Sequence, residues 1–255
     1  MGYVDSANYS CEVKAPRSRL LGIVRYTVFV KAPVKELLII VGNTTSIVDF
    51  TTVATVTMVE NQPTPVRCVA RGGSPPPDMK ITLGRADYTK YFRLDTMPAL
   101  SGTDSFRTLL MTTILVTEQF RVTTRDDDKR ISCIAQVPGL ARIVQSARII
   151  VNYAPRITCK STTAYIGDRN VRITCDVIAR PPVTSWFWIL DDNGTTISEG
   201  DVIDGYWTIV TNRQDKKHLQ LYFRETKETT FRRYTLVVTN IVAKRTAEVP
   251  LKRRT

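Results

Sequence analysis

Residues 121–157 decide the fold, and they read RVTTRDDDKRISCIAQVPGLARIVQSARIIVNYAPRI. An acidic turn at residues 126–128 leads into a short apolar run that contains Cys133. A loop with proline and glycine follows, and residues 143–151 then alternate between apolar and polar side chains. A turn, a strand with a cysteine, a loop and a closing strand make the last hairpin of a β-sandwich. The Tyr-Ala-Pro at residues 153–155 predicts a hinge, because proline cannot continue a strand ladder.

The rest of the chain has the same character. It has 255 residues, of which 43% are hydrophobic, and short alternating runs recur between evenly spread turn-forming residues. No long helical period is present. The sequence therefore predicts an all-β chain with strands about every 8–12 residues.

Residues 1–32 resemble the end of a domain. Asp5, Tyr9 and Cys11 form a D-x-x-x-Y-x-C pattern, residues 25–31 alternate as a closing strand, and Ala-Pro at residues 32–33 predicts a second hinge. In such a hairpin the tyrosine ring packs in the core and the cysteine faces the opposite sheet. We therefore predict a truncated domain in which the partner of Cys11 lies upstream, the alternative being a free buried cysteine.

Residues 33–153 are predicted to form a complete sandwich. Strands are expected at residues 53–59, 66–70, 79–83 and 109–116, with a rigid turn-rich loop at residues 72–77. Cys68 and Cys133 are separated by 65 residues, which suits two strands that face each other across the sandwich. A disulfide closing so long a loop stabilises the fold by roughly 2–4 kcal/mol.

Residues 154–255 are predicted to form a third unit with an altered disulfide. Its Tyr-x-Cys position holds Leu236 after Tyr234, so Cys175 lacks the usual partner. Cys159 and Cys175 each lie eight residues from Gly167. A hairpin that turns there would place them side by side, which predicts a Cys159–Cys175 disulfide; two separate thiols are the alternative. Trp186 and Trp188 are expected on one face of a strand.

The five cysteines indicate disulfides rather than a metal site. No C-x-x-C pair occurs and His218 is the single histidine, which excludes a zinc site of ordinary spacing. The start of the chain, MGYVDSANYSC, lacks the pattern of a signal peptide, and no window reaches the roughly 18 apolar residues of a spanning helix. Read literally, these features predict a cytosolic chain. The cysteines instead predict an ectodomain, because disulfides persist in oxidising compartments.

The net charge of +12 is diffuse and increases toward the C-terminus. Residues 154–255 hold 17 basic and 11 acidic side chains. Such charge favours mild attraction for acidic partners. No nucleic-acid recognition module can be recognised in the sequence, so nucleic acid is not expected as a partner. A patch for sulfated glycans or anionic membrane is one interpretation and a scattered solvated face is the other. The basic residues concerned are Lys216, Lys217, Arg224, Lys227, Arg232, Arg233, Lys244 and Arg245.

Catalysis and metal binding find little support. His218 has no nucleophile motif near it, and no phosphate-binding loop or H-E-x-x-H is present. We therefore predict that the protein is not an enzyme and needs no cofactor. The aspartates at residues 126–128 are interpreted as a solvated turn with one capping residue rather than a calcium site. Three N-glycosylation sequons begin at Asn8, Asn43 and Asn193. Asn193 lies in a predicted turn that tolerates a glycan, whereas Asn8 neighbours the expected buried Tyr9.

These motifs resemble tandem immunoglobulin-like domains. The segments CVARGGSPPPDMKITLG and TRDDDKRISCIAQVPGL…IIVNYAP make residues 33–153 similar to the constant-type second domain of adhesion receptors of the nephrin, Kirre, nectin and SynCAM kind. The sequence departs from that pattern in three places. Ile81 replaces the core tryptophan, Ile131 takes the tyrosine position and Leu236 replaces a cysteine.

The resemblance implies cell–cell adhesion or recognition through another ectodomain, bound homophilically or heterophilically at the extracellular side of the cell membrane. In such receptors the outermost domain usually carries specificity, so the units present here are expected to act as spacer and scaffold. The alternative is a secreted immune-type or glycan-binding module that uses the basic third domain. An intracellular muscle-type immunoglobulin array is a third class, and it predicts reduced cysteines.

Overall fold

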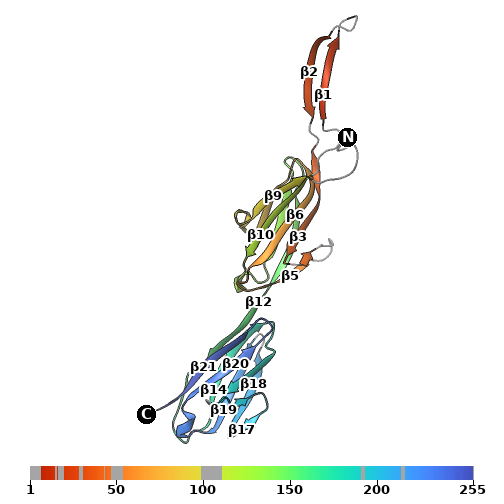
Figure 1. Ribbon diagram of the computed structural model, residues 1–255. Helices are drawn as coiled ribbons and strands as arrows, with labels where there is room; N and C mark the ends of the chain where they lie inside the picture. Colours follow the sequence, from red (N-terminus) through yellow and green to blue (C-terminus); the bar gives the residue numbers. More distant parts are fainter. Residues whose placement is uncertain are drawn as a thin grey trace. The chain divides into compact units, whose positions relative to one another are not determined.

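The chain divides into two compact units, Met1–Ile150 and Val151–Thr255 (Figure 1). The computed structural model describes residues 7–14, 16, 20–28, 31–42, 44–46, 54–98, 111–190, 193–213 and 216–254. Within these ranges the helices are three 3-10 turns: η2 (Thr89–Tyr91), η3 (Thr124–Asp126) and η4 (Glu228–Thr230). None of the described helices is long and apolar enough to cross a membrane.

The N-terminal segment forms an antiparallel hairpin of β1 (Ala7–Lys14) and β2 (Leu20–Val28). Tyr9 lies opposite Tyr26 and Cys11 opposite Val24, so these side chains share one face. The prediction that Tyr9 packs in a core is wrong, because the residue is 47% exposed. Cys11 is likewise exposed and is a free thiol. A two-stranded ribbon supplies no second sheet to bury either side chain.

The first sandwich consists of two sheets. One has the order β4 (Thr44–Ser46), β3 (Ala32–Val41), β6 (Thr64–Ser74), β10 (Met111–Phe120) and β9 (Arg93–Pro98). The other contains β5 (Ala54–Val59), the first part of β12 (Ile143–Cys159), β11 (Arg130–Gln136), β7 (Asp78–Leu83) and β8 (Ala86–Asp87). The predicted hairpin around Cys133 is therefore present as β11 and β12, which pair antiparallel.

A disulfide between Cys68 and Cys133 connects the two sheets. Cys68 lies on β6 and Cys133 on β11, and both are fully buried. Ile81 lies opposite Cys133 on β7. Ile81 and Ile131 are also fully buried. Apolar side chains therefore occupy both positions at which this unit departs from the expected tryptophan and tyrosine.

The prolines at the two predicted hinges lie within strands, so the strand break expected at each of them is absent. Ala32 and Pro33 begin β3, and a register shift follows between Val34 and Glu36. Pro155 lies inside β12, where a register shift between Tyr153 and Arg156 omits it from the pairing. Proline is tolerated at the start of a strand or at a bulge, since no ladder hydrogen bond is required from it there.

The predicted loop at residues 72–77 is shorter than expected. Gly72 and Gly73 continue β6 with φ of +90° and +91°. A Cβ on Gly72 would lie 3.1 Å from the Lys35 backbone nitrogen. Glycine therefore allows the strand to pass close to β3 in a conformation that other residues rarely adopt.

Several strand ends also differ from the predicted ends. β2 begins at Leu20 and β10 extends to Phe120. Residues 29–30, 53 and 109–110 of the predicted strands lie outside the described residues.

The second unit is also a two-sheet sandwich. One sheet has the order β17 (Val202–Ile203), β18 (Tyr206–Arg213), β19 (Lys216–Glu225), β14 (Arg169–Arg180) and the end of β12. The other has the order β13 (Thr162–Ala164), β21 (Lys244–Arg253), β20 (Arg233–Thr239), β15 (Ser185–Ile189) and β16 (Thr196–Ile197).

The predicted Cys159–Cys175 disulfide is present, but the segment between the cysteines is not a simple hairpin. The two residues are register partners on β12 and β14, with their Cα atoms 4.0 Å apart. Between them, β13 pairs in parallel with β21 of the opposite sheet. The turn at Gly167 does form, with φ of +86° and the Tyr165 N–H donating to Asp168 Oδ2 at 2.8 Å. The chain thus contributes to both sheets within one disulfide loop.

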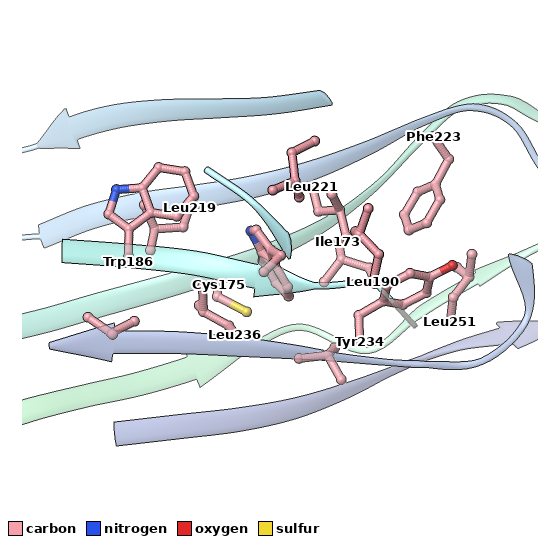
Figure 2. Close-up of a cluster of buried hydrophobic side chains, with 14 of the residues drawn as sticks. Ile173, Cys175, Trp186, Leu190, Leu219, Leu221, Phe223, Tyr234, Leu236 and Leu251 are labelled. Atoms are coloured by element: carbon pink, nitrogen blue, oxygen red, sulfur yellow. The ribbon is translucent and has the colours of Figure 1, made fainter. Parts of the chain in front are cut away.

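The core of the second unit surrounds Cys175 and Leu236, as Figure 2 shows. Trp186 and Trp188 both point into it, which confirms the predicted face, and Trp188 lies opposite Leu236. The Tyr234 hydroxyl donates to the Thr230 carbonyl at 2.8 Å and anchors the turn before β20. Both units are therefore two-sheet β-sandwiches of the immunoglobulin-like type.

Candidate functional site

The outward face of β18, β19 and β14 carries an aromatic pair. Inward residues such as Leu219 and Cys175 are fully buried, so their neighbours in sequence point outward. On this face Trp207 of β18 lies opposite Tyr222 of β19. Their rings are stacked, with centroids 5.1 Å apart and planes inclined by 14°. We call this surface the β18–β19–β14 face.

Polar contacts hold the aromatic pair in place. Arg172 of β14 lies opposite Tyr222, and its Nη1 donates to the Tyr222 hydroxyl at 3.3 Å. The same hydroxyl donates to Gln220 Oε1 at 3.3 Å. The next residue of β18 on this side, Ile209, is 39% exposed. The face therefore combines an ordered aromatic stack with an exposed aliphatic side chain.

A hydrogen-bonded pair of side chains, His218 and Asp176, lies one row further along from Ile209. His218 Nδ1 and Asp176 Oδ1 are 2.5 Å apart, and both side chains are partly buried. Across the strands the pair is flanked by Thr211 of β18 and Thr158 of β12. The sequence neighbours of His218 are basic, but the register of its strand places the imidazole against the side chain of Asp176.

This arrangement suits the recognition of another surface. Trp, Tyr and Arg are the residues most enriched among those that contribute strongly to protein interfaces. Ordered aromatic side chains also lose little conformational entropy when they are covered. The Tyr222 hydroxyl both accepts a hydrogen bond from Arg172 and donates one to Gln220, so it can be covered without being left unpaired.

The sequence analysis did not single out Trp207, Tyr222, Arg172 or Asp176. The alternation of residues 206–213, YWTIVTNR, is the one signal that could have indicated Trp207 as an outward residue. The cross-strand partners could not be found in that way. Asp176 and His218 are 42 residues apart, and only the register of β14 against β19 brings them together.

The acidic turn of the first unit serves a structural role. Asp126 Oδ2 accepts hydrogen bonds from the Thr123 backbone and hydroxyl, and Lys129 Nζ donates to Asp126 Oδ1, all at 2.8 Å. Burial would raise the pKa of Asp126, but the hydrogen bonds from Lys129 and Thr123 outweigh it and hold the pKa below its ordinary value. Asp128 pairs with Arg148 instead. No metal-binding cluster is found among the described residues.

The predicted glycosylation sites have different surroundings. Asn8 is exposed on β1, where its Oδ1 accepts from the Thr27 hydroxyl at 2.8 Å. The expected obstruction by a buried Tyr9 is thus absent. Asn193 is exposed beside Gly194, which has φ of +81°. Asn43 lies outside the described residues.

The basic residues for which a patch and a scattered solvated face were the two interpretations have different surroundings. Arg224, Lys227 and Arg232 line a common hollow. Arg233 pairs with Glu248 on β21, and Lys244 lies over the Phe187 ring. Lys216 and Lys217 begin β19.

Comparisons with known proteins bear on the fold. No protein-family profile matches this chain, and no curated protein matches it. Two structures of the titin I-band fragment I67–I69, one of them an E-to-A variant, are each 13% identical with a TM-score of 0.56 over 100% of this chain and 77% of theirs. The Dpr2 Ig1–Ig2 complex with DIP-Theta Ig1–Ig3 is 15% identical with a TM-score of 0.46, covering 100% and 75%. At these identities the likeness shows the tandem immunoglobulin fold alone.

Proposed function

We propose that this chain belongs to a cell-surface protein that mediates adhesion or recognition by binding another ectodomain, and that the β18–β19–β14 face makes the contact. The observation that carries the proposal is the ordered Trp207–Tyr222 stack held by Arg172 on an outward sheet face.

Charge indicates the kind of partner. Residues 154–255 hold 17 basic and 11 acidic side chains, so this unit attracts acidic surfaces. Arg172 at the edge of the stack would meet a carboxylate of the partner, and long-range attraction would speed association. The proposed partner is therefore an ectodomain with an acidic, partly apolar patch.

The disulfides favour an extracellular setting. The Cys68–Cys133 disulfide connects the two sheets of the first sandwich. The Cys159–Cys175 disulfide connects two neighbouring strands of one sheet in the second. Disulfides of this kind persist in secreted and cell-surface proteins, whereas cytosolic proteins keep thiols reduced. An intracellular array of the muscle type would instead contain free thiols at these four positions, and intact mass measured without reduction distinguishes the two.

The proposed face can be tested by clustering of beads that display the chain, alone and against a panel of ectodomains. We expect Trp207→Ser and Tyr222→Ser to weaken binding at least tenfold, because truncating a central aromatic contact typically costs about 2 kcal/mol or more. Ile241→Ser is the matched control, since Ile241 is 74% exposed in a turn away from this face.

Two results would contradict the proposal. Binding that survives both aromatic substitutions would remove the β18–β19–β14 face from the interface. Absence of binding to the chain itself and to every ectodomain tested would argue against adhesion.

A further inference from the structure

A hollow opens at one end of the second unit. It has a volume of 580 Å³ and lies between the turn before β18, the end of β19, η4 and the start of β20. Its lining includes Asp204, Tyr206, Arg224, Lys227, Thr230 and Arg232. We call it the Arg232 hollow. The volume falls in the range of about 300–1,000 Å³ that is typical of small-ligand sites.

Arg232 is under-satisfied. Its Nη2 donates to the Tyr206 hydroxyl at 3.3 Å, whereas its buried Nε has no hydrogen-bond partner. No carboxylate among the described residues forms an ion pair with it. The neighbouring Arg233 differs, since its Nη1 lies 3.2 Å from Glu248 Oε2. A guanidinium offers five N–H donors, and a partly desolvated one with so few acceptors favours an anion beside it.

The side chain is held in position before any ligand arrives. Its guanidinium lies over the Tyr234 ring, 5.6 Å from the centroid. Below it, Tyr206 and Phe223 pack edge to face at 5.5 Å, and Phe223 packs against Tyr234 at 5.1 Å. Rigid aromatic support of this kind reduces the entropy lost on binding.

We infer that the Arg232 hollow binds an acidic saccharide, with Arg232 donating to a sulfate or carboxylate group of the sugar. A planar guanidinium matches such oxyanions with paired hydrogen bonds. Arg224 and Lys227 add positive charge at the same hollow. This inference is independent of the protein contact proposed for the β18–β19–β14 face.

The rest of the lining favours a sugar over a peptide. Most of the exposed lining is polar. Thr195, Thr229, Thr230 and Tyr206 supply hydroxyl groups, and Asp204 and Glu225 supply acceptors for sugar hydroxyls.

The test is titration of the full chain with heparin-derived tetrasaccharide, followed by calorimetry and by the Arg Nε–Hε resonances. We expect saturable binding that shifts the Arg232 resonance, and a loss of affinity of at least tenfold in Arg232→Gln. Arg233→Gln is the matched control, because it removes the same charge from the adjacent residue. It should change affinity by less than twofold. Arg232→Lys keeps the charge without the planar fork and should bind weakly.

The arms of the experiment separate the possible ligands. Hyaluronan tetrasaccharide carries carboxylates alone, so comparison with heparin tetrasaccharide shows which oxyanion the hollow prefers. Equal losses in Arg232→Gln and Arg233→Gln would mean diffuse charge attraction and would overturn the inference. An unshifted Arg232 resonance in the unmodified chain, or tighter binding of a penta-glutamate peptide, would overturn it as well, and neither result depends on how the variants fold.

Discussion

At the scale of single residues, Leu236 explains how the second unit keeps a sandwich core without a disulfide between its sheets. It occupies the position where the pattern expects a cysteine, is fully buried, and lies opposite Trp188. Its branched side chain fills the volume next to Cys175, whose sulfur is directed to Cys159 instead. Apolar packing thus replaces a covalent link across the core.

Asp126 gives a pH-dependent prediction for the first unit. Because its pKa is lower in the folded chain than in the unfolded chain, the stability it contributes is present above the ordinary pKa of about 3.9 and is lost as pH falls through the folded value. We expect Asp126→Asn to lower the free energy of unfolding by about 1 kcal/mol at pH 7. The difference should narrow at pH 3. Urea denaturation at the two pH values measures it.

The control for this prediction is Asp128→Asn. Asp128 pairs with Arg148, and the side chains of the two residues are 64% and 54% exposed, so removing the charge should change stability little. A difference between Asp126→Asn and the unmodified chain that stays constant from pH 7 to pH 3 would show that the carboxylate is not the source of the effect.

Residues that the sequence predicted well are those whose role follows from local pattern. Alternation was sufficient to place Trp186 and Trp188 on one face of their strand, and symmetry about Gly167 was sufficient to pair Cys159 with Cys175. Tyr9 was misplaced because a local pattern cannot reveal whether a second sheet covers it. Arg232 was one of eight basic candidates, and only its tertiary contacts with Tyr206 and Tyr234 and its unpaired Nε distinguish it.

At the scale of elements, prolines were the main source of error. The sequence correctly predicted strands around Cys68, Cys133, Cys175 and Trp188, because β-branched and aromatic runs at period two leave few alternatives. Pro33 and Pro155 were interpreted as breaks, yet Pro33 lies at the start of β3 and a register shift in β12 omits Pro155 from the pairing. A register shift depends on the partner strand, so one strand's sequence does not reveal it.

The two disulfides should stabilise their units by different amounts. In the chain-entropy model the loop of 16 residues closed by Cys159–Cys175 is worth about 3 kcal/mol and the loop of 65 residues closed by Cys68–Cys133 about 4 kcal/mol. We expect Cys159→Ser/Cys175→Ser and Cys68→Ser/Cys133→Ser to lower the unfolding free energy accordingly in chemical denaturation without reductant.

Cys11→Ser is the control for both double variants, because Cys11 is exposed and unpaired. It should leave both transitions within about 0.5 kcal/mol of the unmodified chain. A Cys159→Ser/Cys175→Ser chain as stable as the unmodified one would mean that the cross-link contributes nothing beyond the packing around Leu236.

At the scale of the whole molecule, each unit has its own core, and the tryptophans offer a way to follow one of them. The three tryptophans of the chain, Trp186, Trp188 and Trp207, all lie in the second unit. Tryptophan fluorescence therefore reports the unfolding of that unit, whereas circular dichroism reports both.

Leu236→Ala should lower the unfolding free energy of the second unit, measured by tryptophan fluorescence, by about 2–5 kcal/mol. The reason is that the substitution leaves a cavity beside Trp188. The unfolding transition of the first unit, followed by circular dichroism, should keep its midpoint. Ile81→Ala, at a fully buried position of the first unit, is the reciprocal control. Loss of both transitions together in either variant would show that the units unfold as one.

The two units also differ in the character of their outward faces. On the sheet of the first unit that contains β6, exposed charges are matched in pairs, with Arg67 3.3 Å from Glu118 and Arg71 2.9 Å from Glu36. The corresponding sheet of the second unit presents the Trp207–Tyr222 stack. We therefore place the proposed recognition surface in the second unit.

The disulfide loop that contains β13 has a mechanical consequence. If the two ends of the second unit are pulled apart, tension reaches Cys159 and passes through the disulfide bond directly to Cys175. The residues between them, including the pairing of β13 with β21, carry no load while the bond is intact. Reduction would place these residues in series with the pulling force and lengthen the extended chain by roughly 50 Å. The Cys159–Cys175 bond therefore limits how far this unit can stretch while the bond is intact.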